Sequence, residues 1–357
     1  MAGIFRFSNP VSDIGKFINT YKQLYHHFVA YTEEDKFFNH DDAARYLALN
    51  GLATSSGAVG EEALNRSTRD DKSLDSLYNQ HKSYSEMFRM LGWYETGDMQ
   101  TNFRIPEYGA YVAETESEDV LKKLFSLNVL HIVSPNPLTT VRGGNILRPI
   151  ATILKLMLQL DDVIFRDEII LGVLACEDDT DITARQSIAR QIRAIRNEDC
   201  NFLENEIQKL MANNGINSGD TLRNYTRFPI SALKWTGWTE PTYLETYGKK
   251  QKSLKLTPAG KQLAMLLNSI PDIRLNDIQS YDIEEQASFV ALSNLQKLEA
   301  IGFDLAEYVS CIEVLKQKCK NIIKDKNIDN NRYLFFGYQE SPRSLLQLSD
   351  GILENLL

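Results

Sequence analysis

The sequence predicts a mainly α-helical protein with small β-hairpins, built as tandem winged-helix (helix-turn-helix) subdomains followed by a helical linker. Three observations carry this prediction. Residues 233–267 have the pattern of a helix end, a β-hairpin and a new helix. A weaker copy of the pattern lies upstream, in residues 90–109. Most other segments show apolar residues at three- and four-residue steps, which is the period of an amphipathic helix.

The hairpin in residues 233–267 is predicted from the residues that end one element and start the next. Gly237 ends a helix, and the following residues 239–247 are rich in Thr and Tyr, as strands are. Residues 248–252 form a basic tip, and residues 253–257 alternate between polar and apolar side chains. Pro258 then starts a helix, at a position where its missing N–H does no harm.

The upstream copy aligns with this hairpin. Residues 90–95 match residues 235–240, and residues 103–109 match residues 254–260 more loosely. Gly92 and Gly109 of the first copy lie closer together in the sequence than the matching Gly237 and Gly260, which a longer second hairpin explains. A supersecondary unit that occurs twice indicates a tandem array.

Composition limits the class of protein. The chain has 357 residues, with 43% hydrophobic and 24% charged residues, as expected for a globular protein of two or three domains. No apolar run reaches the ~18 residues of a membrane helix, and no signal peptide is evident, so we expect a cytoplasmic protein without membrane contact. The four cysteines lack CxxC spacing, so we expect reduced thiols and no zinc site.

The net charge of −9 counts against unspecific nucleic-acid binding, but it leaves room for a local basic face. We expect three parts: residues 1–131 and 132–270 are the two winged-helix subdomains, and residues 271–357 are the helical linker. A loop at residues 131–148, which contains Pro and a Gly pair, sets the first boundary.

In the first part, residues 12–50 predict two helices, and a further helix runs from about residue 72 to residue 91. That last helix precedes the first hairpin, where helix-turn-helix proteins carry the recognition helix, whose N-terminal residues reach base edges. The candidate DNA-binding residues there are Arg66, Ser67, Thr68, Arg69, Asp70 and Lys72. The alternative is a helix cap with solvated charges.

In the second part, helices are expected at residues 150–160, 166–175 and 183–213, and a short one at residues 221–228. The long helix presents arginines on one face, as either a solvated stripe or a stripe facing phosphates. The short helix holds the second recognition position, with Arg and Asn, which pair bidentately with guanine and adenine. The candidates are Arg142, Arg190, Arg193, Arg196, Asn197, Arg223, Asn224 and Arg227, with Lys249, Lys250 and Lys252 on the hairpin as phosphate anchors.

Beyond residue 270, helices are expected at residues 283–300, 304–326 and 341–357, and a strand at residues 332–337. The last helix is apolar up to its final residues, which we take as a sign that more protein follows.

The order of short motifs resembles the DNA-recognition region of type IIS restriction endonucleases and of nicking-endonuclease large subunits, with a FokI-like tandem winged-helix architecture. The matching motifs lie between about residues 60 and 270. They are Ser67-Thr68-Arg69-Asp70, Arg148-Pro149, Arg196-Asn197-Glu198, and Trp235-Thr236-Gly237 ahead of Leu256-Thr257-Pro258.

The resemblance implies that the chain recognises a short asymmetric site in double-stranded DNA. It also implies a linked nuclease domain that needs Mg²⁺ in the full-length enzyme. This chain departs from the family there, because its only acid-x-Lys matches are residues 34–36 and 70–72. The first has no flanking apolar strand, and the second lies in the proposed recognition segment. We therefore assign no catalytic residue, metal ligand or cofactor to this chain, and expect a separate or C-terminal nuclease domain.

Two other functions remain open on the sequence alone. One is a tandem winged-helix transcriptional regulator, in which residues 283–326 form a dimerisation tail. The other is a complete endonuclease with a diverged catalytic site.

Overall fold

The computed structural model describes residues 3–29, 37–67, 71–96, 102–105, 107–130, 132, 134, 145–179 and 181–269, and the pairs 332–333 and 348–349. The fold is mainly helical with small antiparallel sheets, which confirms that part of the prediction. No helix in the described ranges is long and apolar enough to cross a membrane.

The first half begins with helices whose starts are capped by short polar side chains. Asp13, Asn39 and Asp75 each accept a hydrogen bond from a backbone N–H in the first turn of the helix that follows. The elements in order are α1 (Ile14–Phe28), β1 (Phe38–Asn39), α2 (His40–Leu49), α3 (Gly60–Arg66), the 3₁₀ turn η1 (Lys72–Leu74), α4 (Ser76–Met90), β2 (Glu95–Thr96), β3 (Asn102–Arg104), α5 (Glu107–Glu114) and α6 (Glu118–Leu130).

The second half is built around α7 (Pro149–Gln159), which is buried along almost its whole length, including the polar residues Thr152 and Lys155. The remaining elements are β4 (Val163–Phe165), α8 (Arg166–Ile169), the π-helical turn η2 (Ile170–Leu174), α9 (Ile182–Arg196), α10 (Cys200–Asn213), α11 (Gly219–Tyr225), α12 (Arg227–Trp235), β5 (Thr239–Thr246), β6 (Lys249–Leu256) and α13 (Pro258–Ser269). The short strands β7 (Arg332–Tyr333) and β8 (Leu348–Ser349) pair antiparallel.

The same three-stranded sheet order occurs in both halves. The orders are β1-β3-β2 and β4-β6-β5, so an early strand pairs with the second strand of a later hairpin. The registers also agree with the sequence alignment of the two copies. Glu95 lies opposite Arg104 in the first hairpin, and Glu240 lies opposite Lys255 in the second.

The matched glycines have matching surroundings. A Cβ atom on Gly109 would lie 2.5 Å from the carbonyl oxygen of Trp93, and one on Gly260 would lie 1.9 Å from that of Trp238. Both tryptophans are buried. Each half therefore packs the helix after its hairpin directly on the backbone that leads into the hairpin, at a point where no side chain fits.

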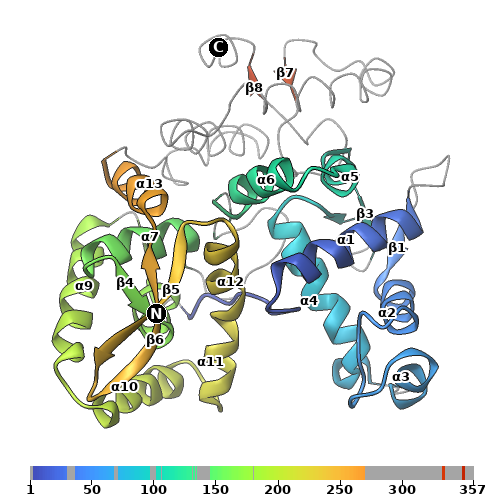
Figure 1. Ribbon diagram of the computed structural model, residues 1–357. Coiled ribbons are helices and arrows are strands. Elements are labelled where there is room, and N and C mark those ends of the chain that lie inside the picture. The colour runs from blue at the N-terminus through green and yellow to red at the C-terminus, as the bar shows by residue number, and fades with distance from the viewer. Residues whose placement is uncertain are drawn as a thin grey trace.

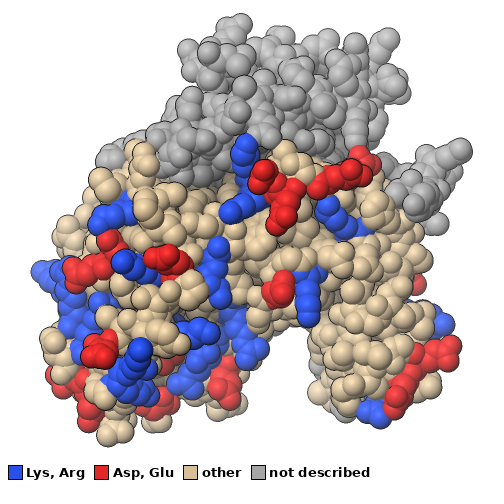
Figure 2. Space-filling view, viewed as in Figure 1, with Lys and Arg blue, Asp and Glu red and all other residues tan. Residues whose placement is uncertain are grey.

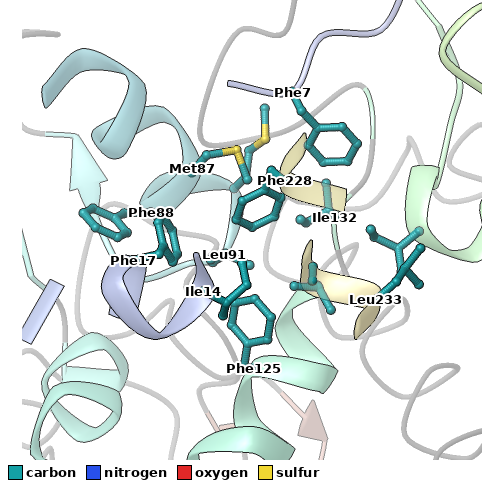
Figure 3. Close-up of a cluster of buried hydrophobic side chains, with 14 of the residues drawn as sticks. Phe7, Ile14, Phe17, Met87, Phe88, Leu91, Phe125, Ile132, Phe228 and Leu233 are labelled. Atoms are coloured by element: carbon teal, nitrogen blue, oxygen red, sulfur yellow. The ribbon is translucent and has the colours of Figure 1, made fainter. Parts of the chain in front are cut away.

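The two halves share one apolar core. Phe228 on α12 lies at its centre, with ring centroids 5.4 Å from Phe17, 5.9 Å from Phe7 and 6.5 Å from Phe125. Figure 3 shows these rings pointing toward one another from separate parts of the chain. The N-terminal segment crosses between the halves (Figure 1), and the N–H of Phe5 donates to the carbonyl oxygen of Leu174 at 2.8 Å. Described residues on both sides of the predicted boundary therefore contribute to one continuous hydrophobic core.

Several predicted helix limits were wrong. In two of these cases a polar capping residue explains the difference. The helix expected from residue 72 begins at Ser76, because Asp75 accepts from the N–H groups of Leu77 and Tyr78. The long helix expected at residues 183–213 is split into α9 and α10, because Asp199 caps a new start.

The end predicted for the short helix at residues 221–228 was also wrong. It ends at Tyr225, where the Thr226 hydroxyl donates to the carbonyl oxygen of Arg223 at 2.8 Å, and α12 starts at Arg227. The strand β8 occupies part of the helix expected at residues 341–357, and β7 lies within the strand expected at residues 332–337. The helices expected at residues 283–300 and 304–326 lie outside the described residues.

Candidate nucleic-acid interface

A basic cleft lies where α12, β6 and the start of α8 meet. Its volume is about 370 Å³, and its floor includes apolar side chains such as Ile164 and Ile169. The cations that line it are Arg166, Arg227, Lys234 and Lys252, and Asp167 is the lining carboxylate. The local charge of this cleft is thus opposite in sign to the net charge of the chain.

Helix α12 has two distinct faces. Phe228, Ala232 and Leu233 are buried in the shared core. The opposite face carries the cleft residues Arg227, Ile230, Ser231 and Lys234 at the i, i+3, i+4, i+7 spacing of one helical stripe. The apolar face therefore fixes the helix, and the polar face is turned toward the cleft.

The cations of the cleft are available to a ligand. Arg227, Lys234 and Lys252 are exposed, and no ion pair within the described parts of the chain involves any of them. Arg166 lies 3.9 Å from Asp167, an ion pair at the limit of contact. These side chains keep their full hydrogen-bonding capacity for an anion.

The β5–β6 hairpin turns through Tyr247 and Gly248, both with positive φ (55° and 69°), as a two-residue type I′ turn requires. The predicted basic tip is partly confirmed, since Lys249, Lys250 and Lys252 are exposed. Tyr247, however, is buried, and it anchors the tip. Its backbone carbonyl accepts from the Cys200 thiol at 2.8 Å, and its phenol bonds to Glu168 at 3.3 Å.

Arg196 belongs to the same anchor. Its guanidinium contacts both carboxylate oxygens of Glu168, at 2.6 and 2.9 Å, and donates to the carbonyl oxygen of Val163 at 2.7 Å. Burial alone would lower the Arg196 pKa, but the hydrogen bond and the charge of Glu168 outweigh burial and raise it. Burial and the neighbouring Glu168 charge also raise the pKa of the Tyr247 phenol. Arg196 thus faces the protein interior rather than a phosphate track.

The other members of the predicted arginine stripe lie at the surface of α9. Arg190 and Arg193 are exposed, and Arg193 donates to the carbonyl oxygen of Gln159. Asn197 is exposed at the end of α9, where its amide donates to the carbonyl oxygen of Arg193 at 3.2 Å. The stripe is therefore divided between an outer part and the enclosed Arg196.

Arg223 and Asn224 lie on α11, away from the helix that carries Arg227. The Arg223 guanidinium is surrounded by carboxylates, at 3.5 Å from Asp167, 3.2 Å from Glu204 and 3.9 Å from Asp220. Burial lowers its pKa, and Asp167 and Glu204 raise it by more. This partly exposed arginine is engaged by carboxylates of the protein, and the half-buried Asn224 follows it on α11.

The first-half candidates mostly stabilise helix ends. Arg66 pairs with Glu62 and donates to the Ser56 carbonyl oxygen at 2.9 Å. The buried Ser67 hydroxyl donates to Asp75, the cap of α4. Lys72 pairs with Asp41 and lies over the ring of Tyr78. Thr68, Arg69, Asp70 and Arg142 lie outside the described residues.

The sequence prediction missed Arg166 and Lys234. Lys234 lies two helical turns after Arg227, so the helical period would have placed both on one stripe if the start of α12 had been recognised. Arg166 directly follows β4, and only the folded sheet brings it to the cleft.

Figure 2 shows how charge is distributed on the viewed face. Lysine and arginine side chains gather over α12 and the β5–β6 hairpin, with acidic residues interspersed toward α9 and α10. The face is also hollowed between the two halves, beside α12 and α4. In the described part of the chain, no group of His, Cys, Asp or Glu is arranged to hold a metal ion.

Searches against protein-family models and curated proteins gave no match to this chain.

Proposed function

We propose that this chain binds double-stranded DNA in a sequence-specific manner, as the recognition part of a type IIS restriction or nicking endonuclease. On this proposal each half is a winged-helix subdomain, and α4 and α12 are the recognition helices. The observation that carries the proposal is the basic stripe of α12, which faces the cleft. The β5–β6 hairpin lies beside this cleft, and its sheet has the strand order that also occurs in the first half.

The geometry suits duplex DNA for a physical reason. A helix enters the major groove with one polar face, while its other face must be held rigidly by the protein. Helix α12 meets both needs. Arg227, at its N-terminus, has the fork-shaped guanidinium that reads guanine, and Lys234 and Lys252 are point charges suited to phosphates.

The proposal assigns Mg²⁺ and strand cleavage to a separate or C-terminal nuclease domain, and it expects a cytoplasmic protein. Duplex DNA with a short asymmetric site is the proposed partner. The described residues supply recognition only.

Binding to a duplex selected from a random-sequence library tests the proposal. We expect Lys234→Ala to weaken binding to selected and random duplexes alike, and to lower the salt slope by about 0.9 for the lost phosphate contact. We expect Arg227→Ala to cost about 1–3 kcal/mol more on the selected duplex than on random DNA.

Lys209→Ala is the matched control, since Lys209 is exposed on α10 and paired with Glu206. If the wild-type chain selects no duplex from the library, DNA recognition is refuted. A stable dimer that selects a palindromic site without any linked nuclease would instead favour a transcriptional regulator.

A further inference from the structure

The hairpin carries an exposed aromatic residue on the side that faces the cleft. Tyr243 on β5 is 61% exposed. Side chains alternate along a strand, so Tyr243 shares a sheet face with Pro241, which lines the cleft. Its cross-strand partner on β6 is Lys252, another cleft residue. The cleft surface therefore continues along the hairpin as far as Tyr243.

A second lysine completes this surface. The ammonium of Lys250 lies 4.6 Å from the centre of the Tyr243 ring, a cation–π contact. Leaving a large aromatic ring in water is unfavourable, and at an exposed site such a contact offsets only about 0.5–1 kcal/mol. Tyr243 thus has one ammonium group over its ring and a second lysine, Lys252, directly opposite in the strand register. This arrangement suits a sugar–phosphate backbone, because the ring can pack on a sugar while the lysines contact phosphates.

We infer that Tyr243, Lys250 and Lys252 form a hairpin surface that contacts the DNA backbone beyond the base pairs reached by α12. The inference rests on the proposed function and extends its footprint to flanking DNA. Glu245 lies opposite Lys250 in the register and marks the outer limit of the surface, because its carboxylate repels phosphates. Since Tyr247 anchors the turn to Glu168, the surface is held in place before DNA arrives.

Photo-crosslinking tests the contact directly. A photoreactive phenylalanine analogue replaces Tyr243 in one variant and Phe202, a partly exposed residue on α10, in another. The probe is an end-labelled random-sequence duplex of about three helical turns. We expect crosslinks to DNA from position 243 and none from position 202. Equal crosslinking from both positions, or none from position 243 while the protein binds the duplex, would overturn the inference.

A duplex-length series gives an independent readout. The selected duplex is compared with versions extended by about half a helical turn on one side or the other. We expect one extension to tighten wild-type binding several-fold, and Tyr243→Ala to remove that gain while binding the short duplex normally. Tyr243→Phe should keep the gain, because the ring remains.

The outcomes separate the two proposals. If the wild-type chain binds no duplex, the proposed function fails. If it binds and Tyr243→Ala responds to both extensions like wild type, only the hairpin surface fails, and a protein partner for Tyr243 becomes the better explanation.

Discussion

Glu168 on α8 is a fully enclosed carboxylate, and its exposed fraction is 0%. An isolated charge in that position would be very costly, so its partners decide whether the fold tolerates it. Arg196 supplies two hydrogen bonds, and Tyr247 and the N–H of Phe165 supply two more. The pair therefore joins α8, α9 and the hairpin turn at one point.

We expect Arg196→Met to lower the free energy of unfolding by about 3–5 kcal/mol, because the Glu168 carboxylate would remain buried without its counter-charge. The measurement is denaturant unfolding monitored by circular dichroism. The double variant Arg196→Met with Glu168→Leu should recover much of the loss. A stable Arg196→Met variant with weakened DNA binding would instead place Arg196 on a DNA contact.

His40 and His81 form a second buried polar pair, with their Nδ1 atoms 2.8 Å apart. Burial lowers the pKa of His40 to about 4, and burial and then the neighbouring His40 charge lower that of His81 well below its usual value. The pair joins α2 to α4, and burial favours the neutral form of both rings, with one Nδ1 donating and the other accepting.

The pair predicts a loss of stability in acid. Between about pH 6.5 and pH 4 the unfolded chain binds protons that the folded chain does not, so the free energy of unfolding falls as pH falls. We expect His40→Gln to reduce that slope by up to about 1.4 kcal/mol per pH unit, whatever its effect at neutral pH. His26→Gln, at an exposed position on α1, is the matched control. Denaturant titrations at a series of pH values measure it.

At the scale of elements, both hairpins depend on a glycine in the helix that follows. Gly260 lies in the first turn of α13 against the Trp238 carbonyl, and Gly109 lies in α5 against that of Trp93. We expect Gly260→Ala and Gly109→Ala each to lower the free energy of unfolding by about 1–3 kcal/mol or more, because backbone atoms must move.

Gly219→Ala is the matched control. Gly219 lies in the first turn of α11, and its Cβ would meet only Arg223 and Met211 atoms at 3.7 and 3.8 Å. We expect a change within about 0.5 kcal/mol in thermal or denaturant unfolding. If Gly260→Ala proved as harmless as Gly219→Ala, the equivalence of the two hairpins would lose its structural basis.

The same elements show what the sequence could predict. Hairpin positions followed from local rules, because Gly237, Pro258 and the alternating pattern of residues 253–257 act over a few residues. The breaks at Thr226 and Asp199 were missed because a single capping bond outweighed a continuing helical period. Cleft residues were missed when their positions depended on distant contacts. No local pattern places Arg166 beside α12 or turns Arg196 inward toward Glu168.

For the whole molecule, the apolar contact between the halves decides whether they act as one body. Phe228 belongs to α12, yet its ring packs on Phe7 and Phe17 from the first half. Its neighbour along the chain, Arg227, faces the cleft. The helix proposed to read DNA is therefore also the main contact between the halves, which fixes its position relative to α4.

We expect Phe228→Ala to lower the free energy of unfolding by about 3–5 kcal/mol, and to uncouple the halves. Hydrogen exchange at increasing denaturant measures both effects. In the wild-type chain, core amides of α4 and α7 should open together, because one hydrophobic core spans both. In Phe228→Ala the two sets should open at different free energies. Phe202→Ala, at a partly exposed site on α10, should leave them coupled.

Separate opening in the wild-type chain would mean that the shared core does not join the halves into one cooperative unit. The spacing between α4 and α12 would then have to be set by the DNA itself.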